Sequence, residues 1–106
     1  MTISDRYREI TREVRAFAAS LGDLGEGEGG RRFREAGKAV AVLDELHDAV
    51  GDIPRISLEV KLTPVLLKAH QKLDQARLLF EEAGEEDRAA KSWELEQKIY
   101  RLLNDL

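Results

Sequence analysis

Apolar residues near the start of the chain recur at alternating intervals of four and three. The series is Ile3, Tyr7, Ile10, Val14, Phe17, Leu21 and Leu24. This spacing places the side chains along one seam of a helix, as in heptad packing. Thr2 followed by Asp5 fits a capping box at the amino end. The pattern therefore predicts an α-helix over residues 4–20.

A second seam with the same spacing follows. Its members are Phe33, Ala36, Val40, Leu43, His47 and Val50, and they predict a helix over residues 31–50. Between the two helices, residues 22–30 contain five glycines, whose ordering costs too much backbone entropy for a regular element. We expect a flexible loop there. Its formal G-x-G-x-x-G pattern follows a helix and carries two glutamates, which favours a linker over a dinucleotide site.

Two further helices are predicted in the C-terminal half. Thr63 and Pro64 fit the N-cap and first position of a helix over residues 64–83, and Gly84 fits its end. A fourth helix is predicted over residues 85–104. The short link around Gly84 forces these two helices into an antiparallel hairpin.

The spacing of six residues in this hairpin resembles that of the tetratricopeptide family. They are Leu73, Ala76, Phe80, Gly84, Ala89 and Trp93. Glu96 departs from the family pattern, which has a small residue at that position. The resemblance covers one hairpin and implies a pair of packed helices, since a single repeat cannot bury its own apolar face.

The segment RISLEVKL, residues 55–62, has a different period. Its apolar residues are Ile56, Leu58, Val60 and Leu62, which alternate with polar ones between Pro54 and Pro64. Alternation is typical of a half-buried strand, although the same residues also form i,i+4 pairs that a helix would use. We favour the strand. With no second strand candidate in the chain, it would pair with its copy in a second chain and bury these four residues at a dimer interface.

A strand, a Thr-Pro step and two helices over residues 55–103 resemble the ribbon-helix-helix repressors. The resemblance implies an obligate dimer whose paired strands enter the DNA major groove. Its base-facing residues would be Arg55, Ser57, Glu59 and Lys61. The helix after Pro64 is longer than the family's first helix, and Glu59 would lie against an anionic groove.

Charge argues against nucleic acid as the main partner. The chain carries 17 basic and 21 acidic residues, a net charge of −4, and so lacks the basic excess that supplies non-specific nucleic-acid affinity. It has no cysteine, which excludes disulfides, thiolate zinc sites and a cysteine nucleophile. No apolar run approaches the roughly 20 residues of a membrane span, and no signal segment opens the chain. We expect a cytoplasmic protein without membrane contact.

Candidate catalytic and metal-binding residues are few. His47 follows Asp44, and His70 precedes Asp74 by one turn, a spacing that helical bundles use to hold metals. Di-iron bundles use more carboxylates on more helices, so we predict no metal. No nucleophile motif surrounds a serine, and the carboxylates are predicted to lie on solvated faces where nothing shifts a pKa. We expect neither a catalytic site nor a cofactor.

Trp93 and Tyr100 are seven residues apart and therefore share one helix face. Both residue types are enriched at protein interfaces. Together the patterns predict a mainly all-α, single domain over residues 1–106, with four helices and one extended segment near 55–62. The predicted function is a non-catalytic interaction or assembly module that forms a homodimer. The alternative is a ribbon-helix-helix-like DNA-binding regulator.

Overall fold

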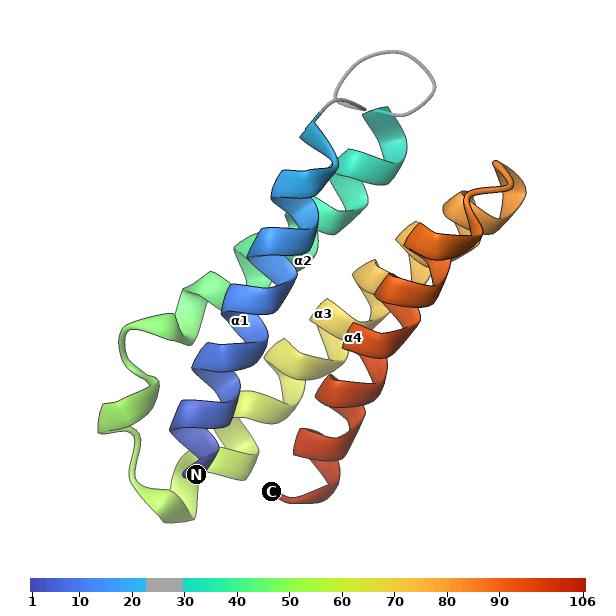
Figure 1. The fold of residues 1–106 in the computed structure, drawn as a ribbon. Coiled ribbons are helices and arrows are strands. Elements are labelled where there is room, and N and C mark those ends of the chain that lie inside the picture. Colours follow the sequence, from blue (N-terminus) through green and yellow to red (C-terminus); the bar gives the residue numbers. More distant parts are fainter. Residues whose placement is uncertain (23–29) are drawn as a thin grey trace.

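The computed structural model describes residues 1–22 and 30–106. Within these ranges the chain forms four α-helices and a short 3-10 helix and no strand (Figure 1). They are α1 (Ile3–Ser20), α2 (Gly30–His47), η3 (Val50–Asp52), α3 (Arg55–Glu82) and α4 (Glu86–Asn104). The all-α prediction is confirmed. Most of the predicted glycine-rich loop, residues 23–29, lies outside the described residues.

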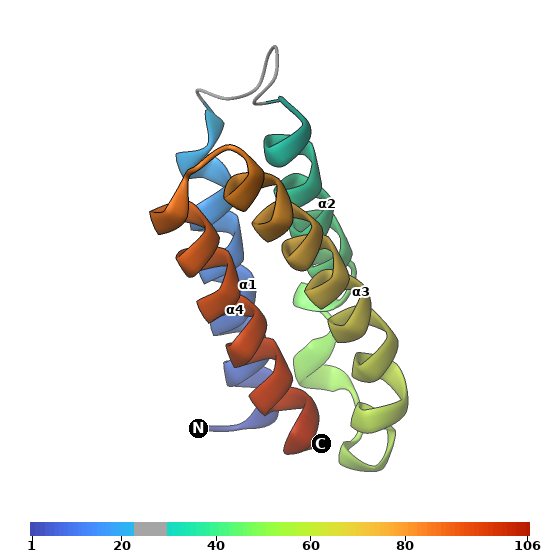
Figure 2. The same cartoon turned by 90° about the vertical axis from the view of Figure 1, so that its right-hand side faces the viewer.

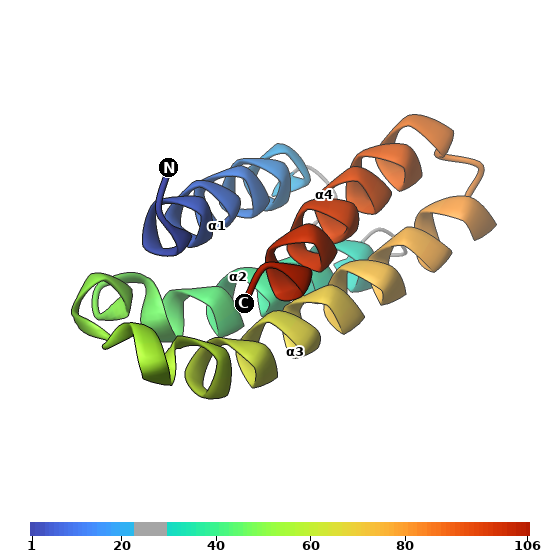
Figure 3. The same ribbon diagram turned by 90° about the horizontal axis from the view of Figure 1, so that it is seen from below.

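The helices form an antiparallel bundle in which α1 and α4 make one layer and α2 and α3 the other (Figures 2 and 3). Each helix packs against its neighbour in the sequence, and α4 packs back against α1. The connection from α2 to α3 contains η3. The bundle measures 44 × 22 × 20 Å. The predicted C-terminal hairpin is therefore present, with the termini and the η3 connection at the opposite end from its turn.

The helix ends follow the expected local chemistry. The Asp5 backbone N–H donates to Thr2 Oγ1 at 3.1 Å, and the Thr2 backbone N–H donates to Asp5 Oδ2 at 3.4 Å, which completes the predicted capping box. At the α3–α4 turn, Gly84 adopts φ +75°, a conformation that other residues rarely accept. The Glu85 N–H then donates to the Phe80 carbonyl at 2.9 Å.

One apolar cluster fills the space between the four helices. Its fully enclosed large side chains include Tyr7, Val14, Leu21, Leu43, Leu62, Leu66, Leu73, Phe80, Leu95, Ile99 and Leu102. The rings of Phe17 and Phe80 meet edge to face with centroids 5.9 Å apart, joining α1 to α3. The Tyr7 hydroxyl donates to the Leu43 carbonyl at 2.6 Å, so this buried polar group is satisfied.

The prediction of an extended segment near residues 55–62 is wrong. These residues form the first two turns of α3, which begins at Arg55, well before the predicted start at Pro64. A helix satisfies the backbone N–H and C=O groups within the segment itself, whereas a lone strand would leave both edges unpaired. It also directs Leu62 and Leu58 onto the core.

Pro64 therefore lies inside α3 instead of opening it. An interior proline costs about 3 kcal/mol because it removes one helical hydrogen bond and crowds the preceding turn. Burying Leu62 and Leu66 on either side of it is worth roughly 1.5–3 kcal/mol for each side chain. Tertiary packing can thus offset the cost of the proline.

α2 is shorter than predicted. It ends at His47, and Val50 belongs to η3 rather than to the helix. The Arg8 Nε–H donates to the His47 carbonyl at 3.2 Å, and the Ser4 hydroxyl donates to the Val50 carbonyl at 3.2 Å. These two side chains of α1 hold the connection in place where the helix stops.

Candidate functional site

The outer face of α3 carries four apolar side chains that the bundle leaves exposed. Their exposed fractions are 91% for Ile56, 73% for Val60, 55% for Leu67 and 47% for Leu78. At about 100° per residue, all four fall within about 40° of one another around the helix axis. They form a single line along α3, which we call the outer strip.

The opposite face of α3 belongs to the core. Its residues are Leu62, Leu66, Ala69, Leu73, Ala76 and Phe80, all fully buried. A helix at the surface of a bundle normally has one apolar face and one polar face. α3 has apolar residues on both, so one of its faces lacks a partner within the described chain.

The predicted interface residues separate into two groups once the segment is helical. Ile56 and Val60 belong to the outer strip, whereas Leu62 is fully buried and Leu58 packs against the core. Residues two apart in a helix point about 200° away from each other, so a set that shares one face of a strand cannot share one face of a helix. The predicted set of four therefore does not form one surface.

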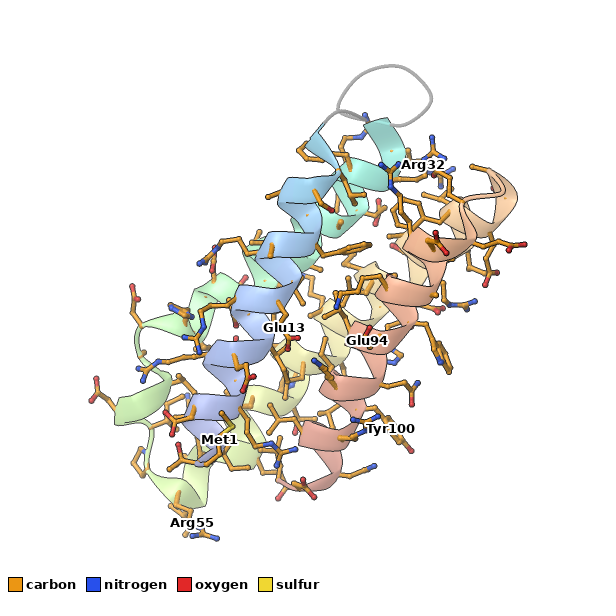
Figure 4. The ribbon with its side chains drawn as sticks, in the orientation of Figure 1. Met1, Glu13, Arg32, Arg55, Glu94 and Tyr100 are labelled. Atoms are coloured by element: carbon orange, nitrogen blue, oxygen red, sulfur yellow. The ribbon has the colours of Figure 1, made fainter. Side chains whose placement is uncertain are left out.

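Trp93 and Tyr100 remain together on the outer side of α4. They are 50% and 54% exposed, and Tyr100 projects from α4 away from the bundle (Figure 4). Their exposure is compatible with the predicted role at an interface, which stays a prediction.

The residues assigned to DNA contact do not share a face either. Arg55 and Ser57 are two positions apart in α3 and point about 200° apart, whereas Ser57 and Lys61 point the same way. Arg55 lies at the end of the bundle (Figure 4). Readout by a β-ribbon needs a strand, and the segment that would supply it is helical.

A buried carboxyl group lies between α3 and α4. The side chain of Glu96 is completely enclosed, and among the described residues neither of its oxygens has a well-formed hydrogen bond. The nearest basic side chains are those of Arg77, with Nε 3.7 Å from Oε2, and His70, with Nε2 3.8 Å from Oε1. The neighbouring Ser92 hydroxyl is used elsewhere, since it donates to the Leu73 carbonyl at 2.7 Å.

These surroundings make Glu96 a weaker acid than a solvent-exposed glutamate. Burial, and after it the nearby Asp74 carboxylate, raise the pKa of Glu96 from 4.5 to about 8. Partial burial would also raise the pKa of Asp74, but the Glu96 carboxyl and the Arg77 guanidinium outweigh it and lower that pKa below 3.8. At neutral pH the pair therefore holds one proton, on Glu96.

The expectation that every carboxylate lies on a solvated face is wrong for Glu96. An acid and a carboxylate with separated pKa values are also a pattern of acid–base catalysis. Glu96 is enclosed on all sides, however, and cannot touch a substrate. In the sequence, the one feature that distinguished Glu96 was its position, where the tetratricopeptide pattern has a small residue.

An open hollow lies beside this polar cluster at the turn of the hairpin. It has a volume of about 580 Å³ and is lined by Arg77, Glu81, Gly84, Glu86, Ala89, Ala90 and Trp93. The Arg77 guanidinium carbon lies 5.5 Å from the centroid of the Trp93 ring, within the range of a cation–π contact. We call this feature the Trp93 hollow.

The candidate metal residues are engaged separately. Asp44 pairs with Arg15 of α1, and Asp74 pairs with Arg77 at 2.8 Å. His70 faces Glu96. Over residues 1–22 and 30–106, no three His, Asp or Glu side chains are grouped as a metal ion would require. In the same ranges no helix combines the length and apolar character needed to cross a membrane.

Comparison with protein families, curated proteins and solved structures found no match. The candidate functional features of the described residues are therefore the outer strip of α3, the buried Glu96 carboxyl group and the Trp93 hollow.

Proposed function

We propose that this chain is a non-catalytic assembly module of the cytoplasm that forms a homodimer through the outer strip of α3. The observation that carries the proposal is the alignment of Ile56, Val60, Leu67 and Leu78 on an exposed helix face. Isolated apolar side chains are common on protein surfaces, but four on one face of one helix favour a partner, although Gln71 and Asp74 lie between Leu67 and Leu78 on that face.

The spacing of the strip favours a second copy of the chain as that partner. Ile56 and Leu78 each lie 11 residues from Leu67. If two α3 helices pair antiparallel across a two-fold axis at Leu67, then Leu67 meets Leu67 and Ile56 meets Leu78 of the second copy. Such self-complementarity is what an interface between identical chains requires. Val60 then falls opposite Asp74, whose carboxylate is occupied by Arg77.

Charged residues beside the strip fit the same pairing. In this pairing, Arg55 of one copy is offset from Glu81 of the other by two residues, or about 3 Å along the axis. Glu59 of one copy is offset from Arg77 of the other by the same distance. Both combinations are of opposite sign. Long side chains span such an offset, so the pairing brings complementary charges together at the rim.

The size of the strip sets the expected strength of the dimer. Two copies bury eight exposed or half-exposed apolar side chains, at roughly 1–2 kcal/mol each. Association costs an estimated 4–15 kcal/mol in lost translational and rotational freedom. These terms are of similar size, so we expect a reversible dimer of micromolar affinity.

The absence of cysteine from the chain makes the pairing directly testable by disulfide cross-linking. A Leu67→Cys variant should cross-link to itself under mild oxidation, because the two copies of residue 67 meet at the axis. Ile56→Cys alone should not, but a mixture of Ile56→Cys and Leu78→Cys chains should. Ala16→Cys, an exposed position on α1, is the control. Absence of cross-linked Leu67→Cys in a sample that is dimeric would show that this pairing is wrong.

A further inference from the structure

The Trp93 hollow offers an aromatic wall on a floor of small residues. Ala89, Ala90 and Gly84 line it without filling it, and half of the Trp93 side chain is accessible to solvent. Its volume of about 580 Å³ is within the range of ligand pockets. The hollow lies at the turn of the hairpin.

Arg77 lies over the Trp93 ring, but its charge is already balanced. Its Nε and Nη2 atoms contact Asp74 Oδ1 at 2.9 and 2.8 Å, and its Nη1 donates to Glu81 Oε1 at 2.8 Å. Two carboxylates therefore hold one guanidinium. The cation is fixed in position and leaves net negative charge beside the ring.

A further carboxylate strengthens this negative field. Glu86, in the first turn of α4, is exposed and lines the hollow together with Glu81. The charged groups in the lining are thus one basic and two acidic residues. Burial, and after it the carboxylates of Asp74 and Glu81, raise the pKa of the adjacent Glu96, whereas Arg77 lowers it.

We propose that the Trp93 hollow binds a basic side chain, the guanidinium of arginine or the ammonium of lysine, presented by a partner polypeptide. The aliphatic stem packs against Trp93 and the alanine floor, as long basic side chains do on apolar surfaces. The cationic head meets the ring and the carboxylates of Glu81 and Glu86. An acidic side chain would meet repulsion at the same place.

Trp93 is the only tryptophan of the chain, so its fluorescence reports on the hollow without labelling. We would titrate the full chain with a tri-arginine peptide at low ionic strength, and with tri-glutamate and tri-serine peptides as comparisons. Tri-arginine should give a saturable change in emission, which added salt weakens. The other two peptides should give none.

Two charge-matched variants locate the effect. Glu81→Gln with Glu86→Gln should weaken tri-arginine binding by about fivefold or more, since exposed ion pairs each contribute modestly. Glu45→Gln with Asp48→Asn removes two exposed charges near the end of α2 and should leave binding unchanged. Far-UV circular dichroism establishes that both variants fold. An equal loss in both variants, an equal response to tri-glutamate, or no response to tri-arginine would overturn the proposal.

Discussion

α1 and α3 both contribute a continuous seam to the core, but their outer faces differ. On α1, the seam of Tyr7, Val14 and Phe17 is buried, and the exposed positions include Asp5 and Arg12. On α3, the outer face carries the strip instead. α1 has the single apolar face that a four-helix bundle needs, whereas α3 has two. This difference is the basis of our proposal that the outer strip of α3 contacts a second copy of the chain.

Adjacent residues on α3 provide the strongest contrast between its two faces. Leu66 is fully buried and Leu67 is half exposed. Leu66→Ala should lower the free energy of unfolding by about 2–5 kcal/mol through lost burial and a cavity. Leu67→Ala should change the stability of the monomer by less than about 1 kcal/mol. Urea denaturation at concentrations where the chain is monomeric measures both. Equal losses would mean that the outer strip packs against this chain.

The α3–α4 contact encloses the Glu96 carboxyl group without a well-formed hydrogen bond from the described residues, whereas the buried Tyr7 hydroxyl between α1 and α2 has one, to the Leu43 carbonyl. The raised pKa of Glu96, about 8 against 4.5, means that the unfolded chain loses this proton above pH 4.5 while the folded chain keeps it up to about pH 8. Stability should therefore fall as the pH rises through this window. We expect a loss of about 2–4 kcal/mol between pH 5 and pH 8.5.

Glu96→Gln is the matched variant, because it keeps the shape and cannot ionise. Its stability should vary much less over the same range, and at pH 8.5 it should exceed that of the unsubstituted chain. The His70 and Arg77 groups and the Asp74 and Glu81 carboxylates face the site from α3 and are present in both proteins. Thermal melts at closely spaced pH values provide the comparison. Parallel pH profiles would contradict the assignment of the proton to Glu96.

The sequence was sufficient for most of the fold. The seams of α1 and α2 are long enough for their period to be unambiguous, and Thr2 and Gly84 mark helix ends by local chemistry. Residues 55–62 are different, because apolar residues at every second position are also i,i+4 pairs. The choice between strand and helix there depends on what Leu58 and Leu62 pack against, which is long-range information.

The candidate sites were only partly predictable. Trp93 and Tyr100 share an exposed face of α4, as their spacing indicated. The enclosure of Glu96 depends on how closely α3 approaches α4, and the sequence of α4 alone does not predict that distance. Leu67 and Leu78 were missed because the expected interface was a strand that ended at Leu62. Once α3 is known to begin at Arg55, the 11-residue intervals that include them are visible in the sequence.

The most direct test of the account is sedimentation velocity on the unsubstituted chain and on Leu67→Glu. We expect the unsubstituted chain to move between its mass of 12.0 kDa and twice that mass as its concentration rises through the micromolar range. Leu67→Glu should stay monomeric at every concentration and unfold at a similar temperature, because a charge at the centre of the strip would be desolvated on pairing. Ala16→Glu, on the exposed face of α1, should dimerise normally. The proposed assembly would be contradicted if the unsubstituted chain remained monomeric. It would also be contradicted if Leu67→Glu dimerised with the same affinity as the unsubstituted chain.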